Sequence, residues 1–303
     1  MVLGDSASLI LRFLRVQQWY KNFVIFLALL FTKNLFNPPL LITTAWGFFA
    51  LCLVSSAYYI LNDIWDLPED RLHPEKKNRP LTSGQISMRT AWAASLLCAL
   101  SGLLLAGWLS GLFFVFVALL LVSGVVYTLG IRNVAVLDIH VIAFNFLLRA
   151  VSGAILIDVA VSPWLVFSIF FVALFLAAGK RESDLRFLEE KSHDKNVLAH
   201  LSSAKRKVYS VYTHPLLQSY VTLLAGVILF TYALYTFMEH NKPYPYMMAT
   251  LPFVSFMVLR YLTFVFSGSP IARKTELVFT DKPMVTALVA WAASAYILLA
   301  HLY

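Results

Sequence analysis

The sequence predicts an all-α polytopic membrane protein, a bundle of about nine transmembrane helices with two charged cytoplasmic loops. Its 303 residues are 60% hydrophobic and only 13% charged, and its mean hydropathy is +0.74. A soluble globular chain has about a quarter of its residues charged, so the composition excludes that class. Long apolar runs recur along the whole chain, so neither a single anchor nor a cleavable signal explains them. We expect residues 1–303 to form one membrane domain.

Nine stretches are long and apolar enough to be membrane helices. About 20 predominantly apolar residues cross the hydrocarbon core as a helix, whereas a membrane barrel shows short alternating strands instead. The first stretch is the weakest, because its uninterrupted apolar core runs only from Phe23 to Phe31. The predicted helices cover residues 19–36, 40–62, 90–108, 111–129, 136–157, 163–181, 216–237, 244–266 and 284–302.

Basic residues are distributed unevenly between the two sides of this bundle. When alternate loops are assigned to one side, 20 of the 24 Lys and Arg residues fall with the N-terminus. Lys33 and Lys242 fall on the other side, and Arg149 and Arg260 lie inside predicted helices. The positive-inside rule therefore predicts an inner (cytoplasmic) membrane protein with a cytoplasmic N-terminus. Because topology accounts for the net charge of +8, nucleic acid is not an expected partner.

Two loops on the predicted cytoplasmic side carry much of the charge. One spans residues 63–89 and the other residues 180–215. Five apolar residues of the second loop are spaced loosely as in an amphipathic helix, which would lie along the bilayer surface or cap a cavity. They are Leu185, Leu188, Val197, Leu198 and Leu201.

The first charged loop begins with oxygen-bearing side chains at the end of the second predicted helix. In YYILNDIWDLPEDRLHPEKKNRPLTSG, residues 58–84, Asn62 and Asp63 are followed by Asp66 and Asp70. Residues three and four apart share a helix face, so Asp63 and Asp66 are expected to point the same way. Pro68 disfavours a continued helix, so helical spacing alone does not place Asp70 one turn further.

Carboxylates that converge at the end of a membrane helix repel one another unless a cation lies among them. Hard oxygen ligands suit Mg²⁺, which binds through one or two carboxylates plus the oxygens of substrate phosphates. A basic run follows at once, and both Lys and Arg bind phosphate. The pattern predicts a diphosphate bridged by magnesium, and the alternative is a solvated loop whose charges only mark the cytoplasmic side. The basic residues are Arg71, Lys76, Lys77 and Arg79.

The pattern N-D-x-x-D-x-x-x-D, formed by Asn62, Asp63, Asp66 and Asp70, resembles the first signature of the UbiA superfamily of intramembrane prenyltransferases. Members of that superfamily are bundles of about nine transmembrane helices. Four further stretches resemble its decaprenyl-phosphate phosphoribosyltransferase branch, and the resemblance extends along nearly the whole chain. They are QWYKN at 18–22, DRLHPEKKNRPLTSG at 70–84, VLDIHVIAFNFLLRAVSG at 136–153 and AGKRESDL at 178–185.

The resemblance implies transfer of 5-phosphoribose from phosphoribosyl diphosphate to a polyprenyl phosphate, with release of diphosphate, in a magnesium-dependent reaction. It implies that Asn62, Asp63, Asp66 and Asp70 hold the metal, so that the three aspartates are the catalytic residues. It also implies two groups of phosphate contacts besides the basic run. They are Lys21 with Asn22, and Lys180 with Arg181.

Arg149 joins the candidate substrate-binding residues on physical grounds. A charge inside the hydrocarbon region is costly and normally faces a bundle interior or a wet cavity. The alternative is a structural pairing with Asp138 or Asp158. No histidine base is required, because the attacking phosphate monoester is already ionised near neutral pH. We expect His140 to form a structural hydrogen-bonded pair with Asp138.

The loop after the sixth predicted helix departs from the superfamily pattern. Members that act on aromatic or other acceptors usually carry a second acidic motif there, D-x-x-x-D, whereas this sequence has Glu182 and Asp184 behind Lys180 and Arg181. The departure weakens the interpretation that the loop holds a second magnesium for a prenyl diphosphate, and it fits a donor with an additional phosphate.

Two rival functions remain open. One is a UbiA-type prenyltransferase with a prenyl diphosphate donor and an aromatic or other small acceptor. The other is a transporter or channel whose charged loops guard a pore, although transporters usually place polar sites at the membrane midplane. The sequence also leaves open the prenyl chain length and whether the protein forms a homo-oligomer.

Overall fold

The structure, a computed structural model, describes residues 2–72, 75–160, 162–190, 208–238 and 246–302. Every regular element in these ranges is a helix, and eight helices are long and apolar enough to cross a bilayer. The prediction of an all-α polytopic membrane protein is therefore confirmed. The eight spans are α3 (Pro38–Trp65), α5 (Met88–Leu109), α6 (Gly111–Leu129), α7 (Leu137–Leu156), α8 (Pro163–Glu190), α11 (His214–Met238), η4 with α12 (Tyr246–Thr250 and Leu251–Phe266) and α14 (Lys282–Leu302).

Shorter helices precede and connect these spans, and those of the 3₁₀ type are labelled η. They are α1 (Val2–Phe13), η1 (Val16–Phe26), α2 (Leu27–Phe31), α4 (Leu67–Asp70), η2 (Lys76–Asn78), η3 (Ile131–Asn133), α10 (Val208–Val211), α13 (Pro270–Arg273) and η5 (Thr275–Thr280).

The first predicted span, residues 19–36, is not a regular α-helix. Its residues 19–31 belong to η1, of 11 residues, and α2, of 5 residues, and the chain leaves the helix after Phe31. Because a 3₁₀ helix rises about 2.0 Å per residue against 1.5 Å in an α-helix, the two together extend roughly 30 Å, the thickness of the hydrocarbon core. Gly153 lets this segment lie directly on α7, since a Cβ there would come 2.3 Å from the carbonyl oxygen of Ile25.

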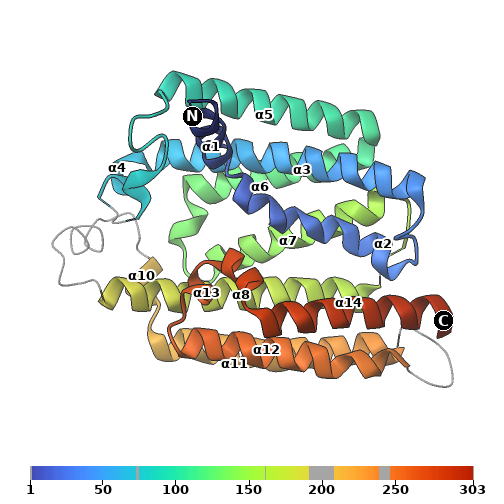
Figure 1. Ribbon diagram of the computed structural model, residues 1–303. Coiled ribbons are helices and arrows are strands. Elements are labelled where there is room, and N and C mark those ends of the chain that lie inside the picture. Colours follow the sequence, from blue (N-terminus) through green and yellow to red (C-terminus); the bar gives the residue numbers. More distant parts are fainter. Residues whose placement is uncertain (1, 73–74, 161, 191–207, 239–245, 303) are drawn as a thin grey trace.

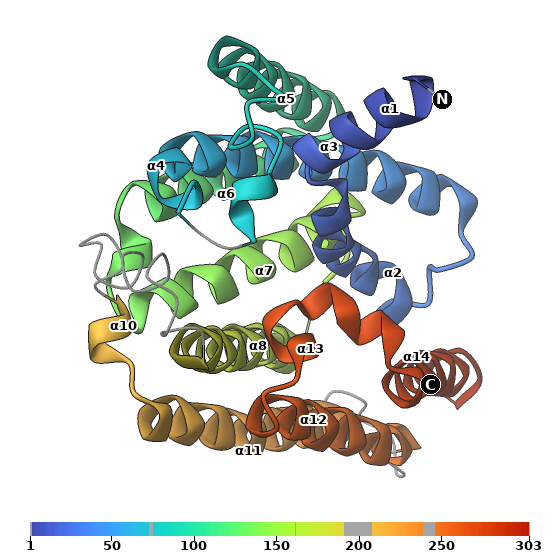
Figure 2. The ribbon, with the colours of Figure 1, turned by 60° about the vertical axis from the view of Figure 1, so that its left-hand side comes forward.

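Two apolar cores hold the bundle together, and α7 belongs to both. The helix α7 lies between α6 and α8 (Figure 2). The first core joins η1, α3, α5, α6 and α7 and contains Val54, Leu120 and Leu148. The second joins α7, α8, α11, α12 and α14 and contains Ile139 and Ile228. The helix α7 thus packs against both halves of the molecule and separates them.

The outward faces of the bundle are apolar. On α5, Leu104 and Trp108 are each 74% exposed. A continuous apolar surface of this kind is unfavourable in water but is covered by hydrocarbon in a bilayer. The chain is therefore an integral membrane protein.

The helices α3 and α8 each contain 28 residues. At about 42 Å they are longer than the hydrocarbon core. Their C-terminal ends lie at the end of the bundle that carries α4 and α10, opposite the C-terminus of the chain (Figure 1). We call this the charged end.

The second charged loop begins as a continuation of α8, which runs on to Glu190. Leu185 and Leu188 of the expected amphipathic helix are buried on this extension. Val197, Leu198 and Leu201 lie outside the described residues. The apolar spacing at the start of the loop therefore reflects packing of a membrane helix against its neighbours.

Candidate active site

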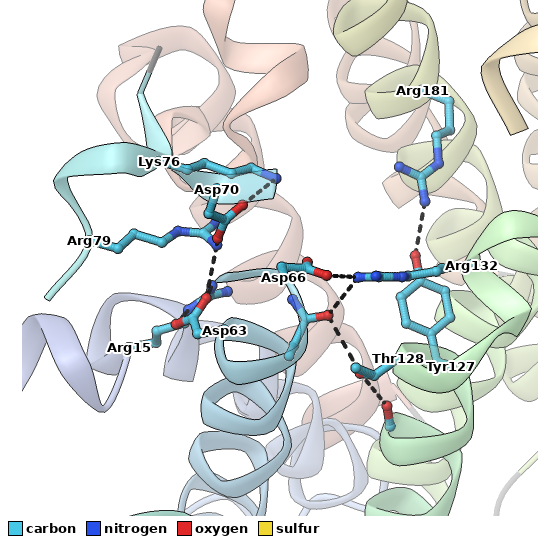
Figure 3. A network of polar contacts seen from close by, with 12 residues as sticks. Arg15, Asp63, Asp66, Asp70, Lys76, Arg79, Tyr127, Thr128, Arg132 and Arg181 are labelled. Carbon is cyan, nitrogen blue, oxygen red and sulfur yellow. Dashed lines mark hydrogen bonds and ion pairs between the residues drawn. The ribbon is translucent and has the colours of Figure 1, made fainter. Parts of the chain in front are cut away.

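The last turn of α3 presents Asn62 and Asp66 to an arginine from η3. Arg132 donates from Nη1 to Asn62 Oδ1 at 3.3 Å and from the same nitrogen to Asp66 Oδ1 (Figure 3). Thr128, at the end of α6, donates a longer hydrogen bond of 3.5 Å to the same Asn62 oxygen. A side-chain amide and a carboxylate thus converge on a single cationic nitrogen.

Asp63 and Asp70 form a second pair around Arg79. Arg79 donates from Nη1 to Asp63 Oδ1 at 2.8 Å and to Asp70 Oδ2. Arg15 also contacts Asp63, with Nε 3.0 Å from Oδ2, and Lys76 Nζ lies 3.6 Å from Asp70 Oδ1. Three carboxylates are therefore matched by four cationic side chains, counting Arg132.

This pairing differs from the expected one, in which Asp63 and Asp66 lie together. The backbone at Asp66 stays near helical geometry (φ −86°, ψ 0°) between α3 and α4. Pro68 falls in the first turn of α4, where its missing N–H is tolerated. The grouping instead follows the arginines: Arg132 of η3 contacts Asn62 and Asp66, whereas Arg79, just after η2, contacts Asp63 and Asp70.

The oxygen donors at this end are hard ligands of the type that a divalent cation such as Mg²⁺ takes. Asp63, Asp66 and Asp70 are 5%, 3% and 1% exposed, and each pair already surrounds a cationic nitrogen. Within the described ranges no three His, Cys or acidic side chains are grouped so as to hold a metal by themselves. Phosphate oxygens would complete the coordination, as is usual for Mg²⁺.

Burial affects the charge of this cluster. It raises the pKa of Asp70 above its ordinary value, and the neighbouring charges of Lys76 and Arg79 only partly oppose it. Such a carboxylate depends on its cationic partners to stay ionised. Lys76 and Arg79 are thus the neighbouring charges that favour the ionised form of Asp70.

A cavity of about 630 Å³ lies beside the carboxylates, between the two halves of the bundle. Asn62 belongs both to the carboxylate cluster and to the cavity wall. Apolar side chains, among them Phe31 and Trp291, line the part away from the charged end. Within the described residues the wall contains four cationic side chains and no Asp or Glu. The four are Arg15, Lys21, Arg149 and Lys180.

Arg149 lies in this cavity wall and is only 3% exposed. It donates to Asn22 Oδ1 and to the carbonyl oxygen of Asn145, both at 2.8 Å, and to the hydroxyl of Tyr58. Neither Asp138 nor Asp158, the alternatives in the sequence, contacts it. The hydrogen bonds of Arg149 instead join η1, α3 and α7 at the cavity.

Lys180 and Arg181 point in different directions, although they are adjacent on α8. Lys180 lines the cavity, whereas Arg181 donates to Asp138 Oδ2 at 2.7 Å. Arg181 also donates to the hydroxyl of Tyr127 at 2.9 Å (Figure 3). Tyr212 donates to the other oxygen of Asp138 at 2.6 Å. Asp138 is therefore paired with Arg181 and Tyr212, and not with His140 as expected.

Glu182 also makes structural contacts. Its carboxylate is fully buried and is bound by Arg186 at 3.2 Å, by Gln218 at 3.2 Å and by His214 at 2.8 Å. Asp184 lies 3.9 Å from Arg181. In the described structure the position of the second acidic motif thus supports the packing of α8 on α11.

The remaining predicted residues differ in their surroundings. Arg71 and Lys77 are exposed at the charged end. Sequence reasoning missed Arg15 and Arg132 as residues of this site. The only signal for them was their place at the basic ends of neighbouring helices, and many other basic residues share that property.

The chain matches the model of the UbiA prenyltransferase family over residues 22–280. It belongs to the UbiA prenyltransferase family. This confirms the resemblance inferred from Asn62, Asp63, Asp66 and Asp70 and makes the protein a membrane transferase.

Relatives of this UbiA family member span nearly its whole length. It is 27% identical to the decaprenyl-phosphate phosphoribosyltransferase of Mycolicibacterium smegmatis, over 95% of this chain and 91% of that protein. It is 30% identical to the decaprenyl-phosphate phosphoribosyltransferase of Corynebacterium glutamicum, over 95% of this chain and 85% of that protein. The structure of a UbiA homolog from Archaeoglobus fulgidus bound to GPP and Mg²⁺ matches it with a TM-score of 0.70 at 19% identity, covering 96% of this chain and 99% of that one. This last similarity shows the fold.

Proposed function

We propose that this UbiA family member transfers 5-phosphoribose from phosphoribosyl diphosphate to a polyprenyl phosphate and releases diphosphate, with Mg²⁺ as cofactor. The observation that carries the proposal is the cavity, whose described wall bears four cationic side chains and no carboxylate and continues into an apolar interior. Such a site suits two phosphorylated substrates, one of them a lipid. The names of the relatives from M. smegmatis and C. glutamicum support the same pair of substrates.

The carboxylate cluster supplies the metal side of this proposal. Asn62, Asp63, Asp66 and Asp70 would hold the ion, which when bound would neutralise charge on the departing diphosphate. Arg79 and Arg132 contact the same oxygens and carry further N–H groups for phosphate oxygens. Arg15, Arg71, Lys76 and Lys77 lie at the same end, and we assign them to phosphate binding as well.

The chain's residues then act mainly by positioning and by electrostatic stabilisation. A phosphate oxygen of the lipid attacks C1 of the ribose as the bond from C1 to the diphosphate breaks, so C1 gains oxocarbenium character. Arginine and lysine side chains stabilise the negative charge that builds on the diphosphate. The lipid phosphate is ionised near neutral pH, with its second pKa near 6, so no general base is required.

We further propose that the protein resides in the inner (cytoplasmic) membrane with the charged end facing the cytosol. The bias of Lys and Arg toward this end supports the orientation. Phosphoribosyl diphosphate would then enter from the water and the polyprenyl phosphate from the bilayer.

Purified protein incubated with Mg²⁺, radiolabelled phosphoribosyl diphosphate and polyprenyl phosphate tests the activity. We expect label in the lipid fraction, and no label with Asp63→Asn, because the change removes one metal-binding charge. Asp158→Asn is the matched control, since Asp158 is exposed and follows the C-terminal end of α7, away from the charged end. If the wild-type protein labels no lipid but consumes a prenyl diphosphate with an aromatic acceptor, the rival prenyltransferase is correct.

A further inference from the structure

The cationic residues of the cavity wall are not equivalent. Arg15 is neutralised by Asp63, whereas Lys21, Arg149 and Lys180 make no ion pair with any residue in the described ranges. Arg149 donates its hydrogen bonds to neutral acceptors of Asn22, Asn145 and Tyr58. Burying a charge without a counterion is strongly unfavourable, so an arrangement of this kind points to an anionic ligand.

The three cations also lie near one another. Lys180 lies within the electrostatic influence of Asp184 and Lys21, and Lys21 within that of Arg149. Glu276 acts on both lysines, but neither Glu276 nor Asp184 forms an ion pair with either of them. Neither lysine makes a hydrogen bond to a described residue, and Lys21 Nζ lies 5.9 Å from the ring centres of both Tyr20 and Tyr59. Both ammonium groups are therefore available to a ligand in the cavity.

The shape of the cavity indicates what is attached to this anion. Beyond the three cations the wall is apolar, and a second cavity of about 240 Å³ shares four of its residues. Polar groups of a sugar donor would find few hydrogen-bonding partners there, whereas a hydrocarbon chain would be favourably buried. The shared residues are Leu27, Phe31, Leu165 and Ile169.

We propose that Lys21, Arg149 and Lys180 bind the phosphate group of the lipid acceptor, in a site separate from the carboxylates that face the leaving diphosphate. This assignment rests on the proposed function and names which substrate occupies which part of the cavity. Three positive charges keep the phosphate monoester fully ionised, and thus nucleophilic, at neutral pH. The two sites adjoin, because the ring centre of Tyr59 lies 5.9 Å from Lys21 Nζ on this site and 5.5 Å from Cζ of Arg15, the partner of Asp63, on the other.

Binding of farnesyl phosphate, measured without donor and with EDTA present, tests the site. We expect Lys21→Gln and Lys180→Gln each to weaken binding about tenfold or more, because each removes a charge-assisted contact. Lys33→Gln should bind as the wild type does, since Lys33 is an exposed lysine in the turn between α2 and α3. Lys21→Arg should restore most of the affinity, because it keeps the charge, and unfolding midpoints would establish that all variants are folded.

Two further probes separate the lipid from other sources of phosphate. Farnesol should bind equally to the wild type and the variants, and inorganic phosphate should compete poorly with farnesyl phosphate. Inorganic phosphate competing as well as farnesyl phosphate would overturn the assignment, because the hydrocarbon would then contribute nothing. The assignment would also be overturned if Lys21→Gln and Lys180→Gln raised the KM for phosphoribosyl diphosphate but left the binding of farnesyl phosphate unchanged.

The same measurements distinguish this assignment from the proposed function. If no ribosyl transfer occurs but farnesyl phosphate binding depends on Lys21 and Lys180, the lipid site stands and the donor is wrong. If ribosyl transfer occurs but substitution of Lys21 or Lys180 does not change farnesyl phosphate binding, the proposed donor is correct and the proposed lipid site is wrong.

Discussion

Glu75 accepts two hydrogen bonds from Arg273 at the end of α13, at 3.1 Å from Nη1 and 3.0 Å from Nη2, and so joins two segments that are 198 residues apart. Arg273 in turn lies 3.7 Å from the centre of the Phe187 ring. Glu75 directly precedes η2 and the loop that carries Arg79, while Arg273 precedes η5, whose residues line the cavity. The ion pair therefore connects the carboxylate cluster to the cavity wall.

We expect Glu75→Gln to loosen the loop that carries Arg79. A partly exposed ion pair contributes at most about 1 kcal/mol, so the KM for the donor should rise by roughly two- to fivefold with little change in thermal stability. Hydrogen exchange in residues 75–87 should become faster. Glu190→Gln, at an exposed end of α8, is the control, and equal exchange in the two variants would argue against the connection.

The same ion pair should respond to pH. Partial burial raises the pKa of Glu75, but the hydrogen bond and charge of Arg273, together with Lys274, outweigh burial, so the net pKa is lower than its ordinary value of 4.5. A carboxyl with a lowered pKa stabilises the folded state above its unfolded pKa and loses this contribution as pH falls through the folded pKa. We expect exchange in residues 75–87, corrected for intrinsic rates, to accelerate below about pH 4.5. Glu75→Gln should lack this step.

Arg132→Met should leave the buried carboxylate of Asp66 without its cation. Removing one partner of a buried ion pair costs about 3 kcal/mol or more, so the unfolding midpoint should fall. If the pair formed by Asn62 and Asp66 binds Mg²⁺, the added ion should raise the midpoint more in this variant than in the wild type.

Arg89→Met, which changes an exposed arginine near the start of α5, is the control for Arg132→Met. Its midpoint and its response to Mg²⁺ should match those of the wild type. An equal response to Mg²⁺ in Arg132→Met and the wild type would remove these two oxygens from the metal site.

Gly124→Ala should disturb the cavity from the neighbouring helix α6. A Cβ at this position would lie 2.6 Å from Cγ of Tyr58, whose hydroxyl accepts a hydrogen bond from Arg149. Since the ring must move, we expect weaker lipid phosphate binding and a loss of transfer of tenfold or more. Gly226→Ala in α11 has no atom within 4 Å of the new Cβ. It should retain activity and be as stable as the wild type or more stable, because Ala favours a helix over Gly by about 1 kcal/mol.

Several features of this protein follow from local sequence. Apolar length predicted eight of the nine spans, because the thickness of the bilayer sets a minimum length for any α-helix that crosses it. The exception was residues 19–36, which pack directly against Gly153 of α7. Because Gly153 is distant in sequence, the local pattern of residues 19–36 does not reveal this contact. Helical periodicity brought Asn62, Asp63, Asp66 and Asp70 to one helix end but did not give their grouping.

The sequence by itself determined that the chain crosses a membrane, that its charge gathers at one end and that an oxygen-rich motif closes α3. These are properties of composition and of residues within two helical turns of one another. Only the tertiary structure decided that Arg132 and Arg79 divide that motif into two pairs, that Arg181 is held by Asp138, and that Lys21, Arg149 and Lys180 share one cavity. These contacts depend on how helices distant in sequence pack against one another, which no local period of the chain specifies.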